Sequence, residues 1–125
     1  MPRETITTDL IAPSVGPFSA AVRAGDLLFL SGQVALDPAT GKLVAGDIGA
    51  QTEQIFANIS AVLEAAGKSF DDVMKTTVYL ADIKDFGPMN AVYARHFQPP
   101  YPARTTIQAA GLPLGAAVAI EIVAR

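Results

Sequence analysis

The sequence predicts an α+β fold in which two helices pack on one face of a mixed, six-stranded sheet. Two observations support this fold class. Strand-like and helix-like segments follow one another as a strand, a hairpin, a helix, a strand, a helix and two final strands. The chain has 125 residues, of which 50% are apolar, so it suits one domain and can fill a real core. We therefore expect a single domain over residues 1–125.

The N-terminal part of the chain predicts three strands. Residues 3–8 alternate and are rich in β-branched types, which favours a short strand. Proline and glycine predict a loop over residues 12–17. Residues 18–24 and 27–32 flank Gly25-Asp26 and predict a hairpin. The apolar stretch from Leu27 to Leu30 lacks alternation, so we expect it to be covered on both faces.

The first helix is predicted over residues 48–66, after a loop at 36–46. Its apolar residues recur at three- and four-residue spacing: Ile55, Ile59, Val62, Leu63 and Ala66. Asp47 is the expected N-cap and Gly67 the expected C′ residue. The polar residues expected to face water are Gln51, Glu53, Asn58 and Glu64.

The second half of the chain predicts three more strands and a shorter helix. A strand over 73–81 precedes a loop at 82–88 and a helix at 89–97, which the prolines at 99, 100 and 102 end. Residues 104–110 and 116–124 predict the last two strands, joined by a turn at 111–115.

Composition excludes several classes of function. The net charge is -3 with no basic cluster, which argues against nucleic acid as the main ligand. With no cysteine, disulfides, thiol nucleophiles and cysteine-held metals are excluded. Mean hydropathy is high, at +0.34, yet no apolar run approaches the roughly 18 residues that span a bilayer. We expect partner subunits rather than lipid to cover the surplus apolar surface, and, without a visible secretory signal, a cytoplasmic location.

Two charged residues lie in strands where charge is costly. Alternation in the last strand places Glu121 on the face of small residues such as Ala117 and Ala119, with Val118 and Ile120 on the opposite face. Arg104 begins the preceding strand, with Thr106 and Gln108 on its face. A guanidinium suits a carboxylate ligand, because two parallel N–H donors match two oxygens. The alternative is structural: Arg104 and Glu121 could pair with each other, or with other charges, on neighbouring strands.

Other residues offer weaker routes to chemistry. His96 is the only histidine, so no metal cluster can be built on it. Ser31 has neither a nucleophile elbow around it nor a partner histidine nearby in sequence. The glycines form no nucleotide-binding pattern. We therefore expect no metal and no cofactor.

A string of short motifs runs over nearly the whole chain. The motifs are Ala12-Pro13, Gly16-Pro17-Phe18-Ser19, Leu30-Ser31-Gly32-Gln33, Lys75-Thr76-Thr77-Val78-Tyr79-Leu80, Asp82, Asp85-Phe86, Asn90 with Tyr93, Pro102-Ala103-Arg104 and Ile120-Glu121-Ile122. Together, and in this order, they resemble the YjgF/RidA family of enamine/imine deaminases. The resemblance implies a chorismate-mutase-like fold and a homotrimer whose clefts lie between subunits.

The resemblance also implies roles for individual residues. Arg104 matches the arginine that grips the substrate carboxylate, and Glu121 matches the acid that positions the attacking water. The residues that match the lining of the cleft are Phe18, Ser31, Gly32, Asn90 and Thr106. Two positions depart from the family pattern: Phe18 replaces a frequent tyrosine, and Ala20 replaces a frequent glutamine.

The reaction implied is the hydrolysis of 2-imino or enamino acids, such as 2-iminobutanoate, to 2-keto acids and ammonia. Three alternatives remain open at this stage. The first is a member that binds a small keto acid without turnover, which the missing hydroxyl at Phe18 favours. The second is a deaminase specific to aminoacrylate or aminomuconate. The third is a ribonuclease or translation inhibitor, a label that some relatives carry and that the acidic balance disfavours.

Overall fold

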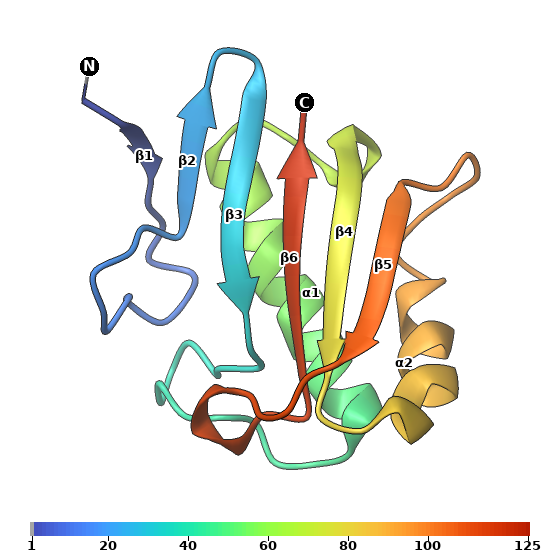
Figure 1. Cartoon of the computed structure of the whole chain (residues 1–125). Coiled ribbons are helices and arrows are strands. Elements are labelled where there is room, and N and C mark those ends of the chain that lie inside the picture. The colour runs from blue at the N-terminus through green and yellow to red at the C-terminus, as the bar shows by residue number, and fades with distance from the viewer. Residues whose placement is uncertain (1) are drawn as a thin grey trace.

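One sheet of six strands forms the framework of the computed structural model, which describes residues 2–125 (Figure 1). The strands are β1 (Glu4–Ile6), β2 (Ala21–Ala24), β3 (Leu27–Gln33), β4 (Val73–Leu80), β5 (Ala103–Gln108) and β6 (Val118–Ala124). Their order across the sheet is β1-β2-β3-β6-β4-β5. β4 and β5 run parallel and the other neighbours are antiparallel, so the sheet is mixed as predicted.

Two helices, α1 (Ile48–Ala65) and α2 (Phe86–Tyr93), lie behind the sheet in Figure 1, α2 beside β5. α1 packs against β3, β6 and α2. The core between these layers holds large side chains such as Phe56, Leu28 and Ile120, all at most 1% exposed. The predicted fold class and the placement of both helices on one face are confirmed. We call the other face, which no helix covers, the open face.

The residues that cap α1 are those that the sequence predicts. Asp47 is the N-cap of α1, and its side chain accepts a hydrogen bond from the backbone N–H of Ala50 at 3.0 Å. Gly67 follows the helix with a φ of +75°, a left-handed conformation that glycine adopts without steric cost. Both expected cap positions are confirmed.

The bounds of α2 were predicted wrongly. The helix begins at Phe86 rather than at residue 89, and it ends at Tyr93 rather than at 97. Gly87 and Pro88 read as helix breakers, but the first turn has no intrahelical partner for its N–H groups and so tolerates proline. At the other end, Arg95 and His96 donate backbone hydrogen bonds to the carbonyls three residues earlier, which makes a tighter last turn.

Two burial predictions also differ from the structure. In β3, Leu28 and Leu30 are buried while Phe29 is 43% exposed on the open face, so one chain covers this strand on one face only. Asn58, expected to face water, is 2% exposed. Its amide donates to the Leu36 carbonyl at 3.0 Å, and its oxygen accepts from Gln54.

Replacing Asn58 should therefore cost stability. In Asn58→Ala the Leu36 carbonyl loses its donor inside the protein, so we expect the free energy of unfolding to fall by about 1–3 kcal/mol. Urea denaturation followed by circular dichroism measures the change. Glu64→Ala, an exposed position on the same helix, is the matched control and should change stability by less than about 0.5 kcal/mol. Equal effects in both variants would mean that the Asn58 amide has no special role.

Candidate functional site

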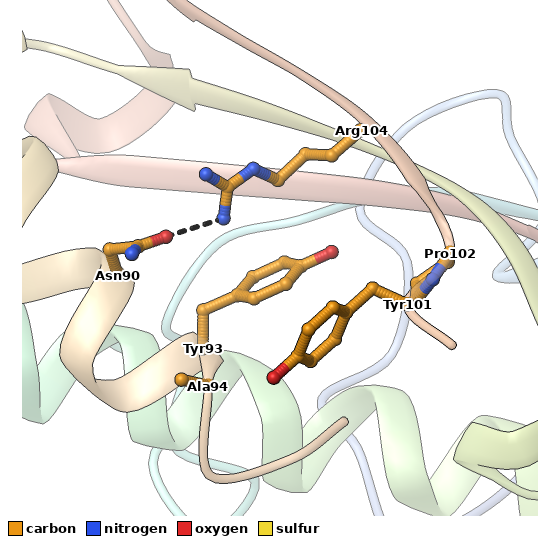
Figure 2. Close-up of a pocket in the computed structure, with 6 residues that line it drawn as sticks. All are labelled: Asn90, Tyr93, Ala94, Tyr101, Pro102 and Arg104. Atoms are coloured by element: carbon orange, nitrogen blue, oxygen red, sulfur yellow. Dashed lines mark hydrogen bonds between the residues drawn. The ribbon is translucent and has the colours of Figure 1, made fainter. Parts of the chain in front are cut away.

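Arg104 lies on β5 with its side chain on the helix side of the sheet. Its partner in the parallel ladder is Thr76, which is fully buried beneath the helices, and paired residues of neighbouring strands point to the same face. One guanidinium nitrogen, Nη1, donates to Asn90 Oδ1 at 2.6 Å (Figure 2). Asn90 comes from α2, so the helix fixes the direction of the arginine.

Two aromatic rings support the guanidinium. Its central carbon lies 4.6 Å from the ring centroid of Tyr93 and 5.4 Å from that of Phe86. Tyr93 is itself held, because its hydroxyl is 2.8 Å from the buried Thr76 hydroxyl. The negative face of an aromatic ring attracts a cation without neutralising it. The arrangement therefore orients a planar cation and leaves its charge available.

The guanidinium opens on a hollow of about 360 Å³. The residues that line this hollow are Asn90, Tyr93, Ala94, Tyr101, Pro102 and Arg104 (Figure 2). Within residues 2–125, Arg104 forms no ion pair with a carboxylate. A half-buried arginine with an amide and two rings for neighbours is suited to an anion from outside, and a carboxylate matches its two parallel donors.

Thr106 lies two residues along β5, on the same face as Arg104. It pairs with Val78, which is fully buried under the helices. Its hydroxyl oxygen is buried and has no hydrogen-bond partner among the described residues.

Glu121 lies on the opposite face of the sheet. Its neighbours along β6, Ile120 and Ile122, are at most 2% exposed in the core, so the half-buried glutamate side chain projects from the open face. The Tyr79 hydroxyl of β4 donates a hydrogen bond to Glu121 Oε1. This hydrogen bond, with burial and the carboxylate charge, raises the pKa of Tyr79 above its usual value. The phenol therefore remains a donor at neutral pH.

Ser31 and Gly32 belong to β3, which lies on the side of Glu121 away from β4. β3 and β6 pair as Leu30 with Ile122 and then as Gln33 with Ile120, so the irregularity at residues 31–32 lies opposite Glu121. Ser31 Oγ donates to the Ser19 carbonyl at 2.6 Å and ties down the segment before β2. Phe18, 55% exposed, shares the lining of one hollow with Gly32.

The candidate residues thus form two groups. One group on the helix face contains Arg104, Asn90 and Thr106. The other contains Glu121, Ser31 and Gly32, with Phe18 beside them. Arg104 and Glu121 bond to different side chains on opposite faces, so the alternative in which they pair with each other is wrong for one chain. Within one chain, one small ligand cannot contact both.

Sequence reasoning missed the side chains that support the two charges. Tyr93 and Tyr79 lie in two of the short sequence motifs, but the motifs neither place Tyr93 beneath the arginine nor connect Tyr79 to Glu121. Alternation alone puts Tyr79 on the face opposite the buried Val78 and Leu80. Alternation does not show how β4 pairs with β6. That pairing places Thr77 opposite Glu121 and Tyr79 opposite Ala119.

Residues 2–125 contain neither a metal cluster nor a membrane-spanning helix. Across residues 2–125 there is no group of three or more histidine, aspartate or glutamate side chains suited to a metal ion. Nor does any helix of that part combine the length and hydropathy needed to cross a bilayer.

The fold is that of a small α+β protein, and its oriented arginine, which has no carboxylate partner among residues 2–125, lies at a hollow suited to a small anion. Comparison with known proteins gives the family. The model described as Endoribonuclease L-PSP matches residues 10–125, and this chain belongs to that family, also called YjgF/RidA. A RutC family protein of Pyrococcus horikoshii is 47% identical over 122 residues, covering 98% of this chain and 97% of the relative.

Two further relatives match this chain over nearly its whole length. The 2-iminobutanoate/2-iminopropanoate deaminase of Mus musculus is 43% identical over 98% of this chain and 90% of its own. The crystal structure of RidA from the Antarctic bacterium Psychrobacter matches with a TM-score of 0.93 at 45% identity, covering 98% of both chains. The fold expected from the resemblance is therefore confirmed.

Proposed function

We propose that this protein hydrolyses short 2-imino and enamino acids, such as 2-iminobutanoate and 2-iminopropanoate, to 2-keto acids and ammonia. The observation that carries the proposal is the Arg104 guanidinium, held by Asn90 and Tyr93 at a hollow and without a carboxylate partner among residues 2–125. The substrate class has a carboxylate beside the reacting C=N carbon, which an arginine can grip. The mouse relative's name supports the same class of substrate.

The chemistry needs few groups. Arg104 holds the substrate carboxylate and so fixes the imine carbon. Glu121 accepts a proton from a water molecule as the water oxygen adds to that carbon, and the proton passes to the nitrogen. The proton of the new hydroxyl then passes to the same nitrogen, relayed by the Glu121 carboxylate, as the C–N bond breaks, the carbonyl forms and ammonia leaves. No cofactor enters this scheme.

We further propose that the two groups meet between subunits of a homotrimer. Arg104 and Glu121 lie on opposite faces of the sheet, so a ligand can touch both only if they come from different chains. The open face is suited to burial, since Phe29 and Ile107 on it are 43% and 44% exposed. A closed ring of identical chains would cover this face and place a Glu121 beside a neighbour's Arg104. The proposed location is the cytoplasm, because a chain without cysteine does not depend on disulfides formed in an oxidising compartment.

An assay of ammonia release tests the activity. We expect the purified protein to speed ammonia release from enzymatically generated 2-iminobutanoate at least tenfold over buffer, which corresponds to about 1.4 kcal/mol of barrier lowering. Calorimetry with 2-oxobutanoate runs beside it. Binding of the keto acid without faster release would contradict the proposal and favour a second candidate.

That second candidate is a member that binds small keto acids without turnover. Phe18 favours it, because this exposed side chain beside Gly32 has no hydroxyl to offer to a reacting group. The aminoacrylate or aminomuconate specificity uses the same residues and is distinguished by comparing those substrates in the same assay.

A further inference from the structure

The hydrogen bond between Tyr79 and Glu121 occupies one end of the carboxylate. The phenol donates to Oε1, and among the described residues Tyr79 is the only side chain that bonds to Glu121. The other oxygen, Oε2, has no protein partner in that part of the chain and can accept from water. A carboxylate fixed at one oxygen and open at the other has the geometry needed to orient a single water molecule.

The sheet register explains why the phenol reaches this place. Thr77 is directly opposite Glu121, and Tyr79, two residues along, is the diagonal neighbour on the same face. Diagonal neighbours lie within reach of a long aromatic side chain. Opposite Tyr79 is Ala119, whose methyl group leaves room for the ring to lean toward Glu121.

We propose that Tyr79 is a positioning residue for the proposed reaction, holding Glu121 Oε1 so that Oε2 is directed at the hydrolytic water. The inference rests on the proposed function, because it assigns Glu121 the water. The raised pKa of Tyr79 keeps the donor in place over the whole range in which an imine hydrolase would be assayed.

Tyr79→Phe tests this inference, because it removes the hydroxyl and keeps the ring. We expect kcat to fall about three- to tenfold at neutral pH with KM little changed, because the carboxylate loses the hydroxyl that holds Oε1 while the carboxylate-binding arginine is untouched. A purely structural role for Tyr79 would lower stability or yield without lowering the kcat of the folded enzyme. Thr77→Val is the matched control, since it removes a hydroxyl from the same strand and face and should leave kcat and KM unchanged.

A second readout does not depend on turnover. The chain has four glutamates, so selective ¹³C labelling of their side-chain carboxyls gives a simple spectrum, in which Glu121→Gln identifies the Glu121 signal. We expect its chemical shift at neutral pH to change in Tyr79→Phe and to stay in place in Thr77→Val, because only the first variant removes the hydrogen bond to Oε1. An active wild type whose kcat and Glu121 signal are both unchanged by Tyr79→Phe contradicts the role of Tyr79 alone. A wild type that releases no ammonia contradicts the proposed function and, with it, this role, even where the carboxyl signal still shifts.

Discussion

Arg104→Ala should lower kcat/KM for 2-iminobutanoate by about a hundred- to a thousandfold. Among the described residues that line the hollow, Arg104 is the only cation, and the loss of a cation that pairs with a ligand carboxylate commonly costs about 3–4 kcal/mol, or about 1.4 kcal/mol per factor of ten. Arg104→Lys should recover little of this. A lysine has no planar fork to match the two oxygens, and it cannot both bond to Asn90 and lie flat over Tyr93. Steady-state kinetics with continuous ammonia detection measures both variants.

The control is a second arginine near the hollow. Arg95 follows Ala94, is 65% exposed and pairs with Glu53 at 3.2 Å, so Arg95→Ala should keep nearly full activity. Thermal unfolding of all three variants separates lost function from lost fold. If Arg104→Ala turned over substrate as well as Arg95→Ala did, the guanidinium would have no part in binding and the proposed site would be wrong.

The sequence predicts the architecture well because the spacing of apolar residues along each strand and helix indicates which residues are buried. In β6 the alternation that singled out Glu121 is the one observed, with Val118, Ile120 and Ile122 in the core. The caps at Asp47 and Gly67 were also predictable from local chemistry. α2 was less predictable, since the same Gly87-Pro88 pair can end a helix or lie in its first turn.

The relation between the two charges could not be predicted from local pattern. Whether Arg104 and Glu121 share a face depends on the register of β4 against both β5 and β6, which side-chain alternation within a single strand does not encode. Asn58 poses a similar problem, because its burial depends on a carbonyl 22 residues away in a loop. Tyr93 occurs in a sequence motif with Asn90, but only the folded chain shows that its ring supports the arginine.

Mixed trimers provide the sharpest test of a site shared between chains. Arg104→Ala and Glu121→Gln should each be nearly inactive alone. If each cleft takes its arginine from one chain and its glutamate from the next, a cleft in a mixed trimer is intact whenever both residues are wild type. Random mixing of equal amounts makes about a quarter of the clefts intact, so we expect about a quarter of wild-type activity to return after denaturation and joint refolding.

The same experiment excludes the simpler geometry. If Arg104 and Glu121 of one chain served one site, every chain in the mixture would carry a defect and refolding together would restore nothing. Light scattering should give about 39 kDa for each sample, three chains of 13.0 kDa, so that a failure to assemble is recognised directly. Mixing without refolding is the further control, because subunits that do not exchange should show no recovery. We expect activity to recover only after joint refolding. Arg104 and Glu121 lie on opposite faces of one sheet, so they can serve one site only when they come from different chains.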